Sequence, residues 1–400
     1  MMNYVIIGNG MTGVTAARNI RRLDADARIT IITDESFPFY SRPGLMYHMM
    51  GILKEWDLRL AKNDDFYHQI GAEIKYASAV RIANDWDAVE LEFGETIAFD
   101  RLLLATGSVS RSLGVPGCDL PGSHFMYSLT DAKRIMDETH KGMKAVVVGG
   151  GLLGAELAEV WRHAGLSVTF LVLEPWYFPK ALSEQQGRII ESEIRRHGCD
   201  LHLQEEVGEI RGGERISHVI TKSGKEFSAD ILGITIGVTP NMGLAKASGL
   251  ETGRGILVDP YFRTSRGNVF AGGDCAEIKF PASERTTLEQ LWYSADRQGQ
   301  VVARNMCGDL KPYDPGPFYN SARFFDLDYV SVGAGRYQGD NQEDETVVSG
   351  NGRAARRFVH RNGIVTGITT VGTNDNPTVI MSLVGDAVSL TEAKRRLGVR

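Results

Sequence analysis

The feature that most constrains the fold is a glycine-rich pattern that occurs twice, each time directly after an apolar stretch. The first copy reads Gly8-Asn9-Gly10-Met11-Thr12-Gly13; it follows the apolar residues 4–7 and precedes a helix-like stretch over residues 14–22. The second copy occupies residues 149–154 and follows the apolar residues 145–148. A G-x-G-x-x-G loop between a strand and a helix is typical of dinucleotide-binding βαβ units. The repeat therefore predicts an α/β fold with two Rossmann-like dinucleotide-binding domains.

Each glycine of such a loop has its own physical role. Gly8 makes the tight turn, Gly10 lets a pyrophosphate approach the backbone, and Gly13 lets the helix pack closely on the sheet. Met11 and Thr12 then begin the helix, where free N–H groups and the positive end of the helix dipole favour phosphate. The matching residues of the second copy are Gly149, Gly151, Leu152, Leu153 and Gly154.

Each loop is followed by an acidic residue at the distance expected of a ribose-binding carboxylate. Asp34 and Glu35 follow the second apolar stretch, and Glu174 follows the corresponding stretch of the second copy. Both glutamates lie about 20 residues after the last glycine of their loops. A carboxylate accepts hydrogen bonds from a free ribose hydroxyl and repels a 2′-phosphate, and residues 173–177 contain no Arg. The second site is therefore expected to prefer NADH over NADPH.

A third motif, Val-Phe-Ala-Gly-Gly-Asp at residues 269–274, reads as a short buried strand that ends in two glycines and a carboxylate. Gly273 leaves the backbone bare for a ligand. Asp274 can accept hydrogen bonds from ligand hydroxyl groups, and a plain strand end with a capping Asp is the alternative. A helix is expected to follow over residues 288–306.

Composition and charge argue against several classes of protein. The chain has 400 residues, which predicts more than one domain, and its net charge of −6 with no long basic run makes nucleic acid an unexpected partner. Its four cysteines lie far apart without a C-x-x-C pair, which argues against a disulfide framework, a metal site or a dithiol redox centre. Since no signal peptide or membrane-spanning apolar run is visible, the expected location is cytoplasmic.

A resemblance to a known family is carried by residues 29–45, by the two loops and by the turn Ala105-Thr106-Gly107. Together these segments resemble the FAD-dependent pyridine nucleotide-disulfide oxidoreductase superfamily. The nearest groups are the NADH-dependent ferredoxin or rubredoxin reductases and the flavoprotein part of assimilatory nitrite reductase. The resemblance implies that the first loop binds FAD and that the second binds NAD(H).

On the FAD side, the resemblance implies that Arg42 and Pro43 lie along the cofactor and that Arg42 pairs with its pyrophosphate. Asp274 would bond the flavin ribitol, and the segment with Trp292 would run under the isoalloxazine ring. Pro43 stands where thiol-using relatives carry a cysteine, so no cysteine-based redox centre is expected. Tyr47 stands where many relatives place a lysine, which leaves the polar groups around the flavin undefined.

On the NAD side, Glu156 matches a glutamate that lies near the nicotinamide in relatives. A helix-start acid that is merely favoured by the dipole is the alternative reading of this residue. Gly237 lies in the segment that resembles the crossover back to the FAD domain.

The resemblance also implies a division into domains. The FAD-binding domain is expected to be discontinuous, with parts at residues 1–114 and 242–312, and the NAD(H)-binding domain is expected at residues 115–241. Residues 313–400 would form a small α+β domain for an interface or an acceptor. In it, strands are expected at residues 329–332, 356–360 and 364–371, with Asn362-Gly363 as a hairpin turn, followed by two short helices.

The expected function is an FAD-dependent NADH oxidoreductase that passes electrons through flavin to an acceptor. That acceptor is expected to be a small rubredoxin- or ferredoxin-like protein or a nitrite-reductase-type partner. No catalytic side chain is assigned, because the cofactor carries the redox chemistry. Three alternatives stay open, namely an NADH:quinone reductase, an NADH oxidase and a flavin-bearing interaction protein that senses NADH. A homodimer is also left open.

Overall fold

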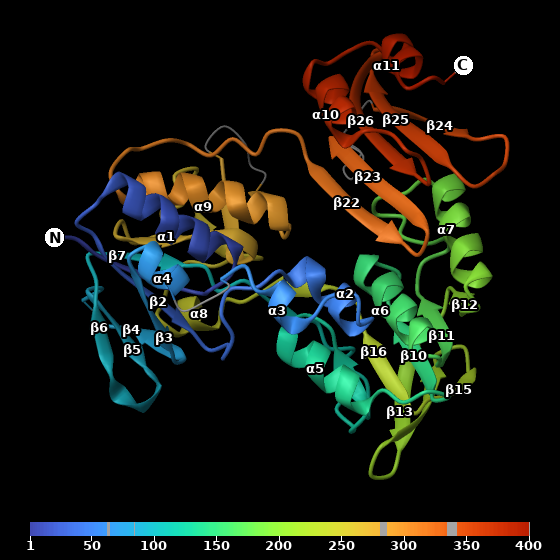
Figure 1. The fold of residues 1–400 in the computed structure, drawn as a ribbon, viewed down its shortest axis with the longest axis horizontal. Helices are drawn as coiled ribbons and strands as arrows, with labels where there is room; N and C mark the ends of the chain where they lie inside the picture. The colour runs from blue at the N-terminus through green and yellow to red at the C-terminus, as the bar shows by residue number, and fades with distance from the viewer. Residues whose placement is uncertain (62–64, 84, 281–285, 334–341, 400) are drawn as a thin grey trace. The chain divides into compact units, whose positions relative to one another are not determined.

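The computed structural model describes residues 1–61, 65–83, 85–280, 286–333 and 342–399, and the chain divides into two compact units (Figure 1). The first unit comprises Met1–His48, Leu53–Val109 and Val238–Pro315. The second unit comprises Met49–Ile52, Ser110–Gly237 and Gly316–Arg400. The second unit therefore contains both the second glycine loop and the C-terminal part of the chain.

A five-stranded parallel sheet forms the core of the first unit. Most of its strands are continuous apolar stretches that are buried along their length, as expected when a parallel sheet is covered on both faces. The strand order is β19 (Val269–Ala271), β7 (Arg101–Leu104), β1 (Asn3–Ile7), β2 (Arg28–Thr33) and β3 (Ala72–Tyr76). The first glycine loop and the Gly-Gly-Asp motif thus follow the carboxyl ends of two strands of one sheet.

Two helices of the first unit, α1 (Met11–Leu23) and α9 (Trp292–Met306), run side by side (Figure 1). They approach closely because Gly299 has no side chain, and a Cβ there would lie 2.7 Å from the carbonyl oxygen of Thr12. The expected start of α9 at residue 288 is wrong. Leu288 instead ends strand β21 (Thr286–Leu288), where it pairs with Glu277 of β20 (Ala276–Lys279), so sheet pairing overrides the helical pattern.

Shorter elements complete the first unit. Among the described residues, its other helices are α2 (Leu45–Met49), α3 (Glu55–Leu58), α4 (Asp65–Gln69) and α8 (Gly243–Ala247). Its other strands there are β4 (Ala79–Ile82), β5 (Ala88–Leu91), β6 (Thr96–Ala98), β8 (Ser108–Ser110), β17 (Val238–Pro240) and β18 (Ile256–Val258). The last residues of α2 and β8, Met49 and Ser110, are assigned to the second unit. Strands β8 and β17 pair with each other. The segment in which the chain leaves the first unit therefore lies beside the segment in which it returns.

The second unit repeats the same sheet, which confirms the prediction of two Rossmann-like folds. Its strand order is β12 (Asp200–Leu203), β11 (Ser167–Val172), β10 (Lys144–Val148), β16 (Ile231–Ile234) and β9 (Ser123–Phe125). The associated helices are α5 (Leu129–Glu138), α6 (Leu152–His163) and α7 (Glu184–Arg196). A separate antiparallel sheet consists of β13 (Val207–Gly212), β14 (Ile216–Thr221) and β15 (Glu226–Ser228).

In its described residues, the C-terminal part of the second unit is an antiparallel sheet with two helices. The strand order is β22 (Tyr319–Phe324), β23 (Leu327–Gly333), β26 (Ile364–Val371), β25 (Ala355–Arg361) and β24 (Glu343–Val348), and the helices are α10 (Pro377–Gly385) and α11 (Leu390–Arg396). Asn362 and Gly363 both have positive φ angles, 51° and 75°, as a tight hairpin requires, so that turn is confirmed. Within the described ranges, no helix combines the length and apolar character that crossing a membrane requires.

Candidate functional site

The first glycine loop is tightly packed at two of its glycines and open at the third. A Cβ at Gly8, whose φ is 119°, would lie 2.0 Å from the carbonyl oxygen of Ala105. A Cβ at Gly13 would lie 2.0 Å from the carbonyl oxygen of Gly8. At Gly10, by contrast, no atom of the described residues lies within 4 Å of such a Cβ. The loop therefore leaves free space at the glycine to which a pyrophosphate is expected to come closest, directly before α1 begins at Met11.

The second glycine loop repeats this arrangement. A Cβ at Gly149, whose φ is 120°, would lie 2.5 Å from the carbonyl oxygen of Thr235. A Cβ at Gly154 would lie 2.1 Å from the carbonyl oxygen of Gly149. Gly151 matches Gly10, because nothing in the described part of the chain lies within 4 Å of its Cβ position. Leu152 and Leu153 follow as the first residues of α6.

The Ala-Thr-Gly turn packs against the first glycine loop. Besides the contact of Ala105 with Gly8, the Thr106 hydroxyl donates a 2.7 Å hydrogen bond to the carbonyl oxygen of Asn241. The Gly107 carbonyl accepts a hydrogen bond of 2.9 Å from the N–H of Asn241, and Gly107 has a φ of 69°. The turn therefore links the segment in which the chain leaves the first unit to the segment in which it returns, at Asn241. In the second unit, Gly237 has a φ of 99° and its carbonyl accepts a hydrogen bond from the N–H of Arg111.

The acidic residues after the two loops differ in their surroundings. Asp34 is exposed, whereas the half-buried Glu35 accepts a 2.7 Å hydrogen bond from the Tyr40 hydroxyl and pairs with Arg42. Arg42, expected along the cofactor pyrophosphate, thus meets the carboxylate expected at the ribose. Glu174 lies over the second loop, with Oε2 3.5 Å from a Cβ position on the neighbouring Gly150.

The Gly-Gly-Asp motif is the centre of a hydrogen-bonded group in the first unit. Ser108 Oγ donates to Asp274 Oδ2 at 3.0 Å, and Gln290 Nε2 donates to Ser108 Oγ at 2.9 Å. Burial raises the pKa of Asp274, while the hydrogen bond from Ser108 and the positive charge of Arg42 oppose that rise. The group therefore fixes the orientation of a carboxylate that is a suitable acceptor for ligand hydroxyl groups.

A second set of contacts holds the backbone of the same motif. Gly273 has a φ of 79°, and its N–H donates a 2.8 Å hydrogen bond to Gln298 Oε1. A Cβ at Gly273 would lie 2.5 Å from Thr12 Oγ1, so only glycine fits between the motif and α1. Trp292, expected near the flavin, stacks on Phe39 with a ring-centroid distance of 6.2 Å and an angle of 6°.

The residues in the loop from Arg42 to His48, part of which is expected to lie along the FAD, differ in exposure and in hydrogen bonding. Pro43 is exposed within a short 3₁₀ turn, Arg42–Gly44, and Tyr47 is half-buried. His48 Nδ1 lies 3.0 Å from the carbonyl oxygen of Leu53, so one ring nitrogen is engaged by the backbone. All four cysteines of the chain are free thiols, and burial raises the pKa of Cys275.

Glu156, the acid expected near the nicotinamide, lies in the first turns of α6. Burial, with a smaller effect of the neighbouring Glu159, raises its pKa to about 7. A carboxyl group with this pKa can hold or release a proton near neutral pH. Tyr177, which the sequence reasoning missed, donates a 2.6 Å hydrogen bond from its hydroxyl to the carbonyl oxygen of Gly151.

The residues present fit two dinucleotides. Each loop has a bare glycine that faces free space, a helix that begins within one residue of it, and a carboxylate at the expected distance. Ser108 and Tyr177 were missed because each supports a predicted residue that is remote in the sequence. The one available signal was the position of Ser108 directly after the Ala-Thr-Gly turn.

Comparison with known proteins agrees with this geometry. The family model for pyridine nucleotide-disulphide oxidoreductases matches residues 2–299. The nitrite reductase [NAD(P)H] of Bacillus subtilis is 27% identical over 98% of this chain, which spans only 48% of that relative. The ferredoxin–NAD(+) reductase subunit of the benzene 1,2-dioxygenase system of Pseudomonas putida is 32% identical over 77% of this chain and 75% of its own length.

Solved structures show the same fold. The putidaredoxin reductase–putidaredoxin complex matches 97% of this chain and 94% of the other, with a TM-score of 0.88 and 23% sequence identity. Because the family model covers well over half of the residues, the chain belongs to the pyridine nucleotide-disulphide oxidoreductase family, whose members are FAD-dependent NAD(P)H oxidoreductases.

Proposed function

We propose that this chain is an FAD-dependent NADH oxidoreductase that supplies electrons to a small redox protein of the ferredoxin or rubredoxin type. The observation that carries the proposal is the repeated loop geometry, in which Gly10 and Gly151 each face free space while the flanking glycines are tightly packed. Two sites of this kind fit a flavin dinucleotide and a pyridine dinucleotide. When bound, FAD supplies the hydride and electron chemistry.

In this proposal, residues of the first unit bind the FAD and orient it. Residues 1–114 and 242–312 form the FAD-binding domain, in which Gly10 and the start of α1 receive the pyrophosphate. Asp274, held by Ser108, accepts hydrogen bonds from the ribitol. Arg42 neutralises phosphate charge once it shares its guanidinium between Glu35 and the cofactor.

The residues of the second unit bind the electron donor. Residues 115–241 form the NADH-binding domain, in which Gly151 and the start of α6 receive the phosphates. Glu174 accepts hydrogen bonds from the adenosine ribose and disfavours a 2′-phosphate. Glu156 contributes a carboxyl group that is partly protonated near neutral pH, at the place expected for the nicotinamide.

The acceptor is inferred from the relatives. The benzene dioxygenase reductase subunit is named for ferredoxin, and other relatives include a rubredoxin–NAD(+) reductase of Pseudomonas putida and an NADH oxidase of Methanocaldococcus jannaschii. Pro43 replaces the cysteine of thiol-using enzymes, and the buried Cys275 has a raised pKa, so we assign no thiol step. A ferredoxin- or rubredoxin-type acceptor therefore fits better than a disulfide substrate.

An anaerobic acceptor screen tests the proposal. The flavin-loaded protein is reduced with NADH under nitrogen and then mixed in turn with a ferredoxin, a rubredoxin, a soluble quinone and oxygen. The return of oxidised flavin absorbance is followed for each mixture. Reoxidation that is much faster with ferredoxin or rubredoxin than with the others is expected. Fast reoxidation by oxygen or quinone alone would instead assign an oxidase or a quinone reductase.

A further inference from the structure

Tyr177 connects the second glycine loop to the C-terminal part of the same unit. Its side chain is completely buried, and its ring packs edge-on against Phe170 and Phe324 with centroid distances of 5.9 and 5.8 Å. Phe170 belongs to β11, whereas Phe324 is the last residue of β22. At the other end of the ring, the hydroxyl group donates the 2.6 Å hydrogen bond to the carbonyl oxygen of Gly151.

The hydrogen bond from Tyr177 orients the Gly151 peptide group, whose helical hydrogen bond is longer than the matching bond of Gly10. In the first loop, the Gly10 carbonyl accepts a helical hydrogen bond of 3.0 Å from Val14. In the second loop, the corresponding bond from Ala155 to Gly151 is longer, at 3.4 Å. A 2.6 Å bond from a buried phenol therefore determines the orientation of the Gly151 peptide more than the helix does.

In the first loop, a buried tyrosine bonds to a side chain instead, because the Tyr67 hydroxyl lies 2.8 Å from Asn9 Nδ2 and 3.0 Å from Asn9 Oδ1. Among the described residues, no side-chain hydroxyl donates to the Gly10 carbonyl oxygen. Counting three residues on from the matched acids Glu35 and Glu174 leads to Pro38 in the first copy and to Tyr177 in the second. Proline has no hydroxyl group to donate. Within the described residues, a phenol that donates to the carbonyl of the middle loop glycine is therefore found at the second site and not at the first. A phenylalanine would have been sufficient for packing alone.

The backbone of Tyr177 is anchored to α7. Its N–H donates a 3.0 Å hydrogen bond to Oε1 of the buried Glu191. The same helix is attached to the C-terminal sheet at its start, because Gln186 Nε2 donates to the carbonyl oxygen of Thr369 at 2.8 Å. The loop tyrosine, α7 and the C-terminal sheet therefore form one connected set of contacts.

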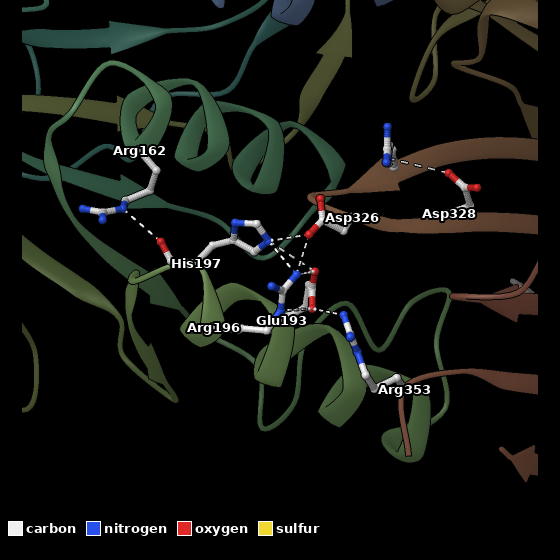
Figure 2. Close-up of polar contacts among 8 residues, drawn as sticks. Arg162, Glu193, Arg196, His197, Asp326, Asp328 and Arg353 are labelled. Carbon is white, nitrogen blue, oxygen red and sulfur yellow. Dashed lines mark hydrogen bonds and ion pairs between the residues drawn. The ribbon is translucent and has the colours of Figure 1, made fainter. Parts of the chain in front are cut away.

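The turn between β22 and β23, here called the hairpin tip (Phe324, Phe325 and Asp326), is fixed on the other end of α7. Figure 2 shows Arg196 and His197 converging on Asp326, with the buried Glu193 beneath them. The ring of Phe325 stacks on His197 at 4.6 Å, and His197 Nε2 lies 3.2 Å from Asp326 Oδ2.

The acidic and imidazole groups of this cluster also have the spacing of metal ligands, since their ligand atoms lie within 4.8 Å of one another. However, the guanidinium groups of Arg196 and Arg353 already pair with Glu193. Two cations beside the carboxylates leave little net negative charge for a metal ion. The cluster is therefore better described as the fastening of the hairpin tip.

We propose that Tyr177 is a positioning residue for the pyridine nucleotide, and that the hairpin tip of the C-terminal part sets its position through Phe324. The tyrosine holds the Gly151 peptide in the orientation in which the loop receives the phosphates. The C-terminal part thus determines the affinity of the nucleotide site without touching the nucleotide. This inference rests on the proposed NADH site and extends it to a part of the chain outside the dinucleotide fold.

The test compares NAD+ binding by the wild type and by Tyr177→Phe, measured by calorimetry on the flavin-loaded protein. The variant keeps the ring and loses only the hydroxyl, so the dissociation constant is expected to rise about five- to twentyfold, in the range of one lost hydrogen bond. Flavin content and visible spectrum are expected to be unchanged. Tyr329→Phe is the matched control, since Tyr329 contacts Phe324 in the same aromatic cluster, and it should bind NAD+ like the wild type.

A second pair of variants tests whether the hairpin tip affects NAD+ binding through Tyr177. Phe324→Leu is expected to weaken NAD+ binding, and combining it with Tyr177→Phe should add little, because both act on the same hydrogen bond. Unchanged NAD+ affinity in Tyr177→Phe, or an equal loss in Tyr329→Phe, would overturn the proposal. Fully additive losses would overturn the role of the hairpin tip. Since NAD+ binding is measured without turnover, these results are independent of whether NADH reduces the flavin.

Discussion

Two of the three glycines of the first loop, Gly10 and Gly13, are expected to respond in opposite ways to the same added methyl group. At Gly10, the backbone is extended, with φ −93° and ψ −170°, and the Cβ position faces free space. At Gly13, the Cβ position lies 2.0 Å from the Gly8 carbonyl oxygen. Gly10→Ala should therefore affect the ligand and spare the fold, whereas Gly13→Ala should affect the fold itself.

The expected magnitudes follow from these distances. Carbon–oxygen contacts are normally about 3.3 Å or longer, so the Gly13→Ala methyl overlaps by more than 1 Å with a backbone atom that cannot rotate away. Overpacking of this kind costs about 3 kcal/mol, the upper part of its usual range. For a unit of this size, that corresponds to a Tm lower by about 6–12 °C.

The Gly10→Ala methyl costs the fold little, because replacing glycine at a helix N-cap is worth less than about 1 kcal/mol. It occupies the space through which the pyrophosphate approaches. The dissociation constant of FAD is therefore expected to rise at least about tenfold, which is about 1.4 kcal/mol.

The assay separates the two effects by comparing the flavin-free proteins. Bound ligand raises Tm by itself, so thermal unfolding is measured after FAD removal, and FAD affinity is measured by fluorescence quenching on reconstitution. Gly267→Ala is the control, because its Cβ position has no neighbour within 4 Å among the described residues and lies in a turn away from the loop. Wild-type FAD affinity in Gly10→Ala, or a Tm of Gly13→Ala equal to that of the control, would contradict the roles assigned to these two glycines.

Three further predictions address single side chains. Ser108→Ala removes the hydroxyl between Gln290 and Asp274, so FAD affinity should fall about fivefold or more, and a wild-type affinity in a reconstitution titration would contradict the role of Ser108. Glu174→Gln removes the charge that disfavours a 2′-phosphate, so the ratio of NADPH to NADH affinity should rise about tenfold or more; an unchanged ratio in binding titrations would argue against this assignment. Glu156 has a folded-state pKa raised to about 7, so its protonated form stabilises the fold at low pH and this contribution is lost as pH rises toward 7. The wild type should therefore lose about 2–3 kcal/mol relative to Glu156→Gln between pH 4.5 and 8, and parallel urea-unfolding profiles for the two proteins would contradict it.

Local sequence patterns correctly predicted the elements that are determined by residues close together in the chain. The glycine loops, the buried parallel strands and the Asn362-Gly363 hairpin each depend on residues that are neighbours in the sequence. Strands β22 and β24 were missed because most residues of β22 are partly exposed, most residues of β24 are exposed, and neither strand shows apolar alternation. The start of α9 was misplaced because Leu288 is committed to a sheet partner, Glu277, which only the tertiary fold supplies.

The same limit applies to the candidate site. Gly10, Gly151 and Glu174 could be chosen from spacing, because a βαβ unit fixes their distances along the chain. Ser108 could not, since it reaches Asp274 from 166 residues away. Likewise, nothing near residue 177 indicates that its hydroxyl meets Gly151 or that its ring meets Phe324. Glu35 and Arg42 were assigned separate ligand groups, whereas the fold pairs them with each other.

Electron transfer from NADH to the bound flavin is tested most directly by an anaerobic titration of the flavin-loaded protein with NADH, followed by visible absorbance. The oxidised flavin band is expected to disappear near-stoichiometrically as NADH is added. An oxidised spectrum that persists in excess NADH, or a protein that takes up no flavin on reconstitution, would contradict it.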